Sequence, residues 1–190
     1  GLSVVGSERC IRERNGTDTW TQVGSDINGQ NHGDRFGSAV RLSSDGTILA
    51  VGASMHDSGK GHVRVYQWNG TDTWTQLGSD IDGKANSNYF GGGHGKISLN
   101  SDGTIIAIGS EVYSTPDYRR GHVMIFQYSS GSWTQLGSDI YGEASSDQSG
   151  SSVSINGDGT IVAIGARAND GTGGENSGHV RAYQWNGTDT

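Results

Sequence analysis

Short apolar runs separated by glycine-containing turns recur along this chain and predict β-strands. In the first copy of the pattern, Ala39–Leu42 leads into an Asp45-Gly46 step, and the nearly continuous apolar run Thr47–Gly52 follows. Asp-Gly between two apolar runs is typical of a hairpin, because glycine accepts the positive φ of a tight turn. The run after the turn predicts a strand that is covered on both faces.

Two further strands are predicted after this hairpin in each copy. A run that follows a Gly-His-Val step alternates apolar and polar residues, over 63–68, 123–128 and 180–185, as a strand nearer to solvent does. An Asn-Gly-Thr-Asp loop then leads into Trp74–Leu77 in the middle of the chain. No segment shows helical periodicity, so each copy predicts four antiparallel strands.

The whole pattern repeats three times at intervals of about 54 to 60 residues. The most constant part reads TWTQVGSDI at 19–27, TWTQLGSDI at 73–81 and SWTQLGSDI at 132–140. A four-stranded unit with this period predicts the blade of a β-propeller, an all-β fold in which each unit buries its faces against its neighbours. A solenoid is the alternative, but its repeats are usually shorter and commonly hold parallel strands.

The repeats divide the chain into three blades within residues 15–190, at about 15–68, 69–128 and 129–185, followed by the start of a further hairpin. Residues 1–14 break the pattern, as a leader outside the repeat or as a degenerate strand. Known propellers need about four to eight blades to close a ring, so three blades would need more. We expect the further blades to come from the same chain, as part of a longer protein, with a second copy that completes a six-bladed ring as the alternative.

The repeat resembles the FG-GAP repeats of integrin α-chain propellers and related surface proteins. In the first copy the resemblance rests on Phe36-Gly37, Asp45-Gly46, Val51-Gly52-Ala53 and Gly61-His62-Val63. It covers residues 15–190, although the third copy has Ser149-Gly150 in place of Phe-Gly and no copy has the proline of G-A-P. The resemblance implies an extracellular or cell-surface module for protein–protein interaction, adhesion or scaffolding.

The resemblance to FG-GAP propellers raises the question of whether the chain binds calcium. Family propellers often hold it in a D-x-D-x-D-G loop, and the matching loops here offer Asn100 and Asp102 or Asn156 and Asp158. Calcium takes six to eight oxygen ligands, usually with several carboxylates, whereas each loop here has one. We therefore expect ordinary Asp-Gly turns and no cofactor, with these four residues as weak calcium candidates.

Composition and motifs exclude several classes of function. The net charge of −7 argues against nucleic-acid binding, and no apolar run is long enough to span a membrane. Cys10 is the sole cysteine, so neither an internal disulfide nor a thiolate zinc site is available. No nucleophile elbow, paired-carboxylate motif or phosphate-binding loop occurs, which predicts a non-catalytic protein. The alternatives are a carbohydrate-binding propeller and a fragment of a propeller hydrolase or lyase with its active site elsewhere.

Three sets of residues are left as candidates for function. His62, His122 and His179 occupy one position in three different blades, so we expect no shared metal site. Asn15, Asn69 and Asn186 begin N-glycosylation sequons within Asn-Gly turns. The loops that join the second strand to the third, and one blade to the next, vary between copies, and variable loops on a rigid scaffold usually carry recognition. The best partner-binding candidates on them are Tyr113, Tyr118, Arg119 and Arg120.

Overall fold

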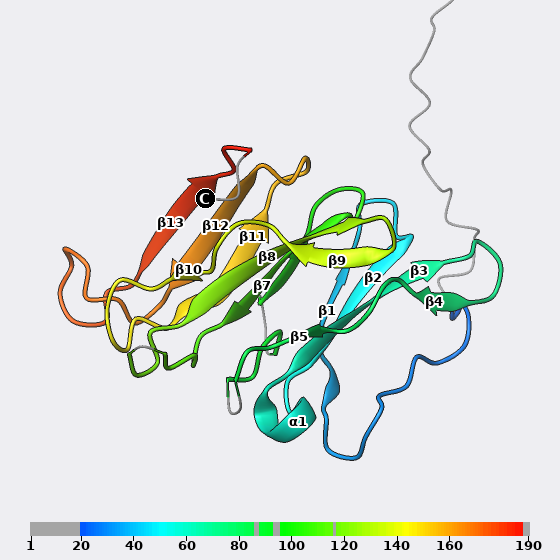
Figure 1. The fold of residues 1–190 in the computed structure, drawn as a ribbon, viewed down its shortest axis with the longest axis horizontal. Helices are drawn as coiled ribbons and strands as arrows, with labels where there is room; N and C mark the ends of the chain where they lie inside the picture. The colour runs from blue at the N-terminus through cyan, green and yellow to red at the C-terminus, as the bar shows by residue number, and fades with distance from the viewer. Residues whose placement is uncertain (1–19, 86–87, 93–95, 116, 188–190) are drawn as a thin grey trace, which may run out of the picture.

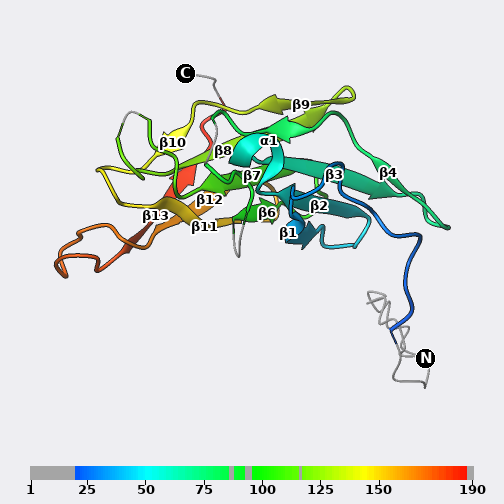
Figure 2. The same ribbon diagram turned by 90° about the horizontal axis from the view of Figure 1, so that it is seen from below.

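The computed structural model describes residues 20–85, 88–92, 96–115 and 117–187, and these form three antiparallel β-sheets. Residues 1–14, Cys10 and Asn15 lie outside this part of the chain. The sheets follow one another in chain order along the long axis, from the cyan sheet through the green to the orange and red one (Figure 1). Strands β4 and β13 lie toward opposite ends of this row (Figure 2). The expected all-β architecture of stacked blades is confirmed.

The first two sheets each contain four strands in meander order and a short fifth. The first sheet comprises β1 (Phe36–Leu42), β2 (Ile48–Ala53), β3 (His62–Trp68), β4 (Trp74–Gln76) and β5 (Ile81–Asp82). The second comprises β6 (Ile97–Leu99), β7 (Ile105–Ser110), β8 (His122–Ser129), β9 (Ser132–Gln135) and β10 (Ile140–Tyr141). The third comprises β11 (Ser149–Ile155), β12 (Ile161–Ala166) and β13 (His179–Gln184). A single turn of helix, α1 (His56–Gly59), lies in the connection between β2 and β3.

The sheets of the structure begin at different residues from the repeat units read from the sequence, and the first two contain one more strand than the four expected. Each tryptophan strand joins the sheet that precedes it, since Trp74 pairs with Trp68 and Trp133 with Tyr128. The sheets therefore run from 36 to 82, from 97 to 141 and from 149 to 184, whereas the sequence units begin at 15, 69 and 129. The Asp-Ile end of the constant motif also forms a strand, β5 or β10, which pairs with the start of β3 or β8.

Strands β2 and β7, the second strands of the first two sheets, are buried on both faces, as their continuous apolar runs predicted, whereas Ile161 of β12 is exposed. Strand β7 shows the arrangement most clearly, because its alternate side chains enter two different cores. Ile106 and Ile108 pack with Val63, Val65 and other residues of the first sheet. Ala107 packs with residues of the third sheet instead. The second sheet thus contributes to both cores, one shared with each neighbour, and a blade without neighbours would expose both faces.

The third strands are less solvent-exposed than the sequence suggested. Only β13 alternates strictly between half-buried and exposed positions. The first two residues of β3 and the first three of β8 are buried, because β5 and β10 cover one edge there and the adjacent sheet covers a face.

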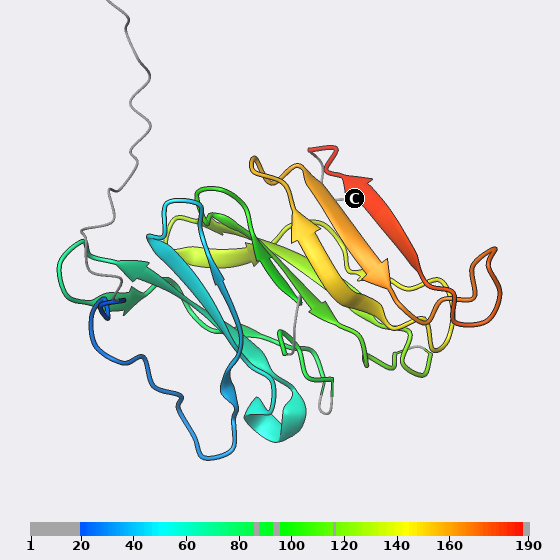
Figure 3. The same ribbon diagram turned by 180° about the vertical axis from the view of Figure 1, so that it is seen from behind.

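Glycines of the repeat allow adjacent blades to approach at backbone distance. Gly52 in β2 faces the carbonyl of Gly91 in the next blade, and Gly109 in β7 faces that of Gly150, so a methyl group at either position would overlap the carbonyl. Gly91 and Gly150 have φ of +66° and +81°, a conformation that favours glycine. Figure 3, viewed from behind, shows the successive cyan, green and orange sheets that these contacts hold together. The glycine of the G-A position in one blade therefore contacts the glycine of the F-G position in the next blade.

This contact can be tested with a matched pair of substitutions. Gly109→Ala should lower the free energy of unfolding by about 2–3 kcal/mol, because the methyl group forces apart two backbones that cannot repack. Gly165→Ala, at the equivalent position of the third sheet, meets only the movable Ser152 hydroxyl and should cost about 1 kcal/mol or less. Urea unfolding of both variants gives the comparison, and equal losses would contradict the role assigned to the Gly109–Gly150 contact.

Candidate functional site

An aspartate of the constant motif lies at the centre of a polar network in each of the first two sheets. In the first, Asp80 accepts two hydrogen bonds from the Arg64 guanidinium, both of 2.9 Å, and one of 2.7 Å from Gln76. In the second, Asp139 accepts hydrogen bonds from Lys84 at 2.6 Å, Gln135 at 2.8 Å and the Tyr141 hydroxyl at 3.1 Å. Lys84 belongs to the link between the sheets, so Asp139 also ties the two blades together.

The environment of Asp139 favours its ionised form. Burial alone would raise the pKa of Asp139, whose side chain is 3% exposed, but its contacts with His122, Lys84 and Gln135 more than offset this and hold the pKa well below its usual range. Burial and the adjacent Asp139 charge raise the pKa of Tyr141 to about 12, so its hydroxyl remains a donor at neutral pH. The network is therefore a fixed charge arrangement that stabilises the fold.

The three equivalent histidines lie in three different sheets, at or near the first residue of β3, β8 and β13. His62 and His122 are each 1% exposed, whereas His179 is partly exposed beside Glu143. Burial lowers the pKa of His62, and the charges of His56 and Arg64 act in the same direction. His122 Nδ1 lies 3.2 Å from Asp139 Oδ2. Their placement agrees with the expectation that these three side chains do not meet.

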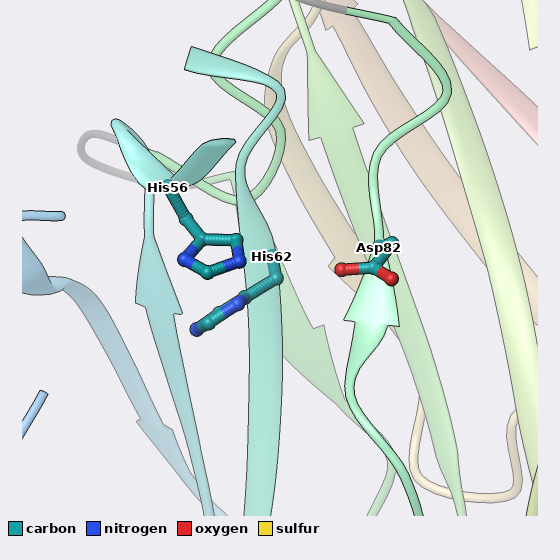
Figure 4. Close-up of side chains that lie close together, drawn as sticks. All are labelled: His56, His62 and Asp82. Atoms are coloured by element: carbon teal, nitrogen blue, oxygen red, sulfur yellow. The ribbon is translucent and has the colours of Figure 1, made fainter. Parts of the chain in front are cut away.

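His62 instead has chemical neighbours within its own sheet, which the sequence did not reveal. His56 on α1 and Asp82 on β5 approach it, and one ligand atom from each of the three residues lies within 4.8 Å of the others. The two imidazole rings lie one over the other, with centroids 4.1 Å apart, and the carboxylate of Asp82 faces them (Figure 4). No local motif signals this group. The pairing register of β5 with β3, which sets Asp82 opposite His62, appears only in the structure.

Tyr113 corrects the sequence-based expectation of a partner-binding residue. It is 7% exposed, and its ring stacks on that of His122 with a centroid distance of 3.9 Å and an interplanar angle of 11°. It therefore takes the place over His122 that His56 takes over His62. Because its ring is buried against His122, Tyr113 stabilises the fold and is not available to a binding partner.

The other partner-binding candidates on this loop, Tyr118, Arg119 and Arg120, differ in how far their side chains are exposed to solvent. Tyr118 is 67% exposed, although its backbone carbonyl accepts hydrogen bonds from Ser145 and Ser146 of the next connection. Arg119 is half-buried with a φ of +47°. Arg120 donates to the Gly142 carbonyl at 2.6 Å and to Asp117 at 3.1 Å. The loop backbone thus joins two blades, and Tyr118 is the side chain that it presents to solvent.

The weak calcium candidates take part in turn hydrogen bonds. Asp102 Oδ1 accepts from the backbone N–H and the hydroxyl of Thr104, and Asn100 Oδ1 accepts from the N–H of Ile105. Asp158 and Asn156 repeat these bonds one blade later. These hydrogen bonds show that the four residues shape the hairpin turns.

Two of the sequon asparagines are in exposed turns. Asn69 Oδ1 accepts hydrogen bonds from the backbone N–H groups of Thr71, Asp72 and Thr73, and its amide donates to Asp72. Asn186 follows β13 and is also exposed. Asn15 is outside the part of the chain that the structure describes.

A pocket of about 410 Å³ opens between the second and third sheets, and we call it the indole slot. Its lining combines the constant motif of one blade with the outer edge of the next, and includes Ile125, Leu136, Asp139, Val162, Tyr183 and Trp185. At the preceding junction the corresponding space holds the indole of Trp133, which donates to the Leu77 carbonyl at 2.8 Å and packs against Tyr128. By analogy with the preceding junction, the slot corresponds to the position of the tryptophan side chain of a following repeat.

The fold and these junctions define a protein built from stacked propeller-type blades. Residues 141–183 match the model of the FG-GAP repeat, which confirms the resemblance derived from the sequence. Among solved structures, the chain is similar to TolB from Acinetobacter baumannii, with a TM-score of 0.46 and 12% sequence identity, over 80% of this chain and 30% of that one. The chain therefore spans about 30% of the length of the TolB chain. No curated protein sequence matches it. Within the described ranges, no helix is long and apolar enough to cross a membrane.

Replacing Asp139 tests the polar network. Asp139→Asn should lower the free energy of unfolding at pH 7 by about 2–3 kcal/mol, because it leaves Lys84 and His122 without their anion. Asp26→Asn, in the exposed first copy, should change it by less than about 0.5 kcal/mol.

The effect should depend on pH in a defined direction. A carboxylate with a depressed pKa stabilises the folded state above the pKa of the unfolded chain, about 3.9, and that stabilisation fades as the pH falls toward the folded-state pKa. The gap between wild type and D139N should therefore narrow below about pH 4. A gap in urea unfolding that stays constant from pH 7 to pH 3 would show that the charge of Asp139 is not what stabilises the network.

Proposed function

We propose that this chain is a non-catalytic propeller module of the cell surface or the extracellular space, and that it acts through protein–protein interaction. The match of residues 141–183 to the FG-GAP repeat supports this class of function. The observation that carries the proposal furthest is the indole slot, because the chain itself contains the kind of strand that fits it.

The two internal junctions specify how a strand enters such a slot. In the first sheet, Trp74, Thr75 and Gln76 pair with Trp68, Gln67 and Tyr66. In the second, Trp133, Thr134 and Gln135 pair with Tyr128, Gln127 and Phe126. In both, the indole N–H donates to a carbonyl of the preceding constant motif, that of Val23 or Leu77. The edge of β13 offers the same order of residues at Tyr183, Gln184 and Trp185.

In a longer protein a further repeat of the same chain would fill the slot. For the isolated 190-residue chain, the occupant we assign is the segment 20–27 of a second copy. Its sequence, WTQVGSDI, differs from the strand segments 74–81 and 133–140 only by valine for leucine. Trp20 is fully exposed, with a relative accessibility of 102%, and residues 20–22 belong to none of the strands in the described part of the chain. Pairing would place Trp20 of the second copy opposite Trp185, with its indole N–H directed to the Leu136 carbonyl.

Such pairing joins the end of one copy to the beginning of the next. A head-to-tail contact of this kind forms either a closed ring or an open filament, depending on the rotation between copies. Two copies would contribute six blades, which is within the range of about four to eight blades found in closed propellers. The exposed edge of β13, a hazard for non-specific association, would then be covered by a specific partner.

Tryptophan substitution tests the assembly. Sedimentation velocity of the isolated chain should show a discrete dimer, and Trp20→Ala should convert it to a monomer, because the strand loses both its indole hydrogen bond and its buried ring. Tyr118→Ala, which removes an exposed aromatic ring from a loop far from β13 in the sequence, should leave the dimer intact. A wild-type monomer at all concentrations, or a dimer that survives W20A, would overturn the proposed occupant.

Tyr118 is the side chain we assign to recognition of a protein partner on the loop face. It lies on a loop whose backbone is fixed to the next blade through Ser145, Ser146 and Gln148. A rigid backbone that carries an exposed tyrosine is a suitable binding surface, because little conformational entropy is lost when a partner docks.

The extracellular part of the proposal can be tested through Asn69. The amide nitrogen of Asn69 is the atom that a glycan would modify, while Oδ1 could still accept the three backbone hydrogen bonds of the turn. Expressed through a eukaryotic secretory pathway, the protein should lose the mass of a glycan on glycosidase treatment. Thr71→Ala, which removes the sequon but leaves Asn69 in place, should abolish the Asn69 share of that loss. An intact mass unchanged by the enzyme would count against glycosylation.

A further inference from the structure

The group formed by His56, His62 and Asp82 brings together the helix α1 and the paired strands β3 and β5. His56 comes from α1, His62 begins β3, and Asp82 ends β5. One ligand atom of each lies within 4.8 Å of the other two, and Figure 4 shows the carboxylate directed at the pair of rings. Among the described residues, this is the one group of at least three His, Cys, Asp or Glu side chains with such spacing.

His62 has no hydrogen-bond partner for either ring nitrogen, although it is 1% exposed. The nearest carboxylate, that of Asp80, lies 3.6 Å from Nδ1. A buried polar group without a partner is costly and uncommon in folded proteins. A ligand that accepts the lone pair of an imidazole nitrogen would satisfy this side chain.

His56 is already oriented as a metal ligand would be. Its Nδ1 lies 2.9 Å from Asp34 Oδ2, and that carboxylate is also held by the backbone and side-chain amides of Asn31. A carboxylate behind a histidine fixes the tautomer with the proton on Nδ1 and leaves the lone pair of Nε2 available. Carboxylate–histidine–metal arrangements in proteins have this form.

We propose that His56, His62 and Asp82 bind a divalent transition-metal ion of the Zn²⁺ class, with Asp34 as the residue that orients His56. Two imidazoles and one carboxylate are a ligand set that zinc accepts, and a fourth position would be open on the solvent side, where Asp82 is exposed. Ligands about 2.1 Å from a tetrahedral ion lie about 3.4 Å from one another. His56 and Asp82 would therefore move inward by small side-chain rotations, while the buried His62 stays in place.

The second sheet provides an internal comparison. There Tyr113 stacks on His122 where His56 stacks on His62, and Tyr141 pairs opposite His122 where Asp82 pairs opposite His62. Two phenol rings thus replace an imidazole and a carboxylate around an equally buried histidine. In the second sheet, phenol rings at these two positions are enough to pack around the histidine. Packing alone therefore does not explain why the first sheet has an imidazole and a carboxylate there.

Zinc titration of the full chain, purified without a histidine tag, tests the proposal. Calorimetry should show one saturable site, and Co²⁺ in place of Zn²⁺ should give the visible absorption of a four-coordinate ion. His56→Tyr and Asp82→Tyr, which copy the second sheet and should fold, are expected to abolish both signals. Asp34→Asn should weaken the affinity about 10–100-fold, as the loss of an orienting carboxylate typically does.

Two controls separate this site from other histidines and acids. His179→Ala removes the equivalent histidine of the third sheet and should leave the binding unchanged. The double variant Y113H/Y141D transfers the ligand set to the second sheet and should add a second site. The proposal is falsified if wild type shows no saturable Zn²⁺ binding, or if binding persists unchanged in H56Y and D82Y.

Discussion

The close approach of backbones between blades is the constraint on which the rest of this structure depends. Strand β7 carries apolar side chains on both faces, and both faces are buried because a neighbouring sheet lies on each side. Gly52 against Gly91, and Gly109 against Gly150, bring the sheets near enough for those side chains to meet. The outer edges are joined by a second contact, in which an indole N–H reaches the preceding constant motif. The distance between blades is thus fixed at two separate places, and the loops between them are free to vary.

The hairpins, the buried second strands and the blade architecture were all predictable from the sequence, because each depends on local signals. Asp-Gly steps define turns, continuous apolar runs define strands with two buried faces, and the period defines the unit. The two-residue strands β5 and β10 carry no such signal, since their pairing depends on how Leu77-Gly78 and Leu136-Gly137 redirect the chain. Their existence decides the site, because β5 sets Asp82 opposite His62.

Whether a given loop residue is buried or exposed could not be predicted from the sequence, for a different physical reason. Tyr113 and Tyr118 are five positions apart on one variable loop, yet the first is buried and the second is exposed. What distinguishes them is the position of His122, whose flat ring offers Tyr113 a stacking surface. Likewise, the approach of His56 and Asp82 follows from tertiary register and not from their spacing in the chain. Residue type indicated which side chains were suited to binding, while only the fold could show which were available.

The buried histidine links the scaffold to chemistry. Its position is constant in the first two blades, where a ring stacks on it and an aspartate of the constant motif lies beside it. In the second blade, His122 Nδ1 lies 3.2 Å from Asp139 Oδ2 without a hydrogen bond, and the surrounding rings are the phenols of Tyr113 and Tyr141. In the first blade, Arg64 draws Asp80 into a two-fold hydrogen bond, and His62 is left 3.6 Å from that carboxylate without a hydrogen bond. The same scaffold position thus lacks a hydrogen bond at Nδ1 in both blades. Only the first blade surrounds it with an imidazole and a carboxylate, which can bind a metal ion, whereas the second surrounds it with two phenol rings, which fill the space by packing.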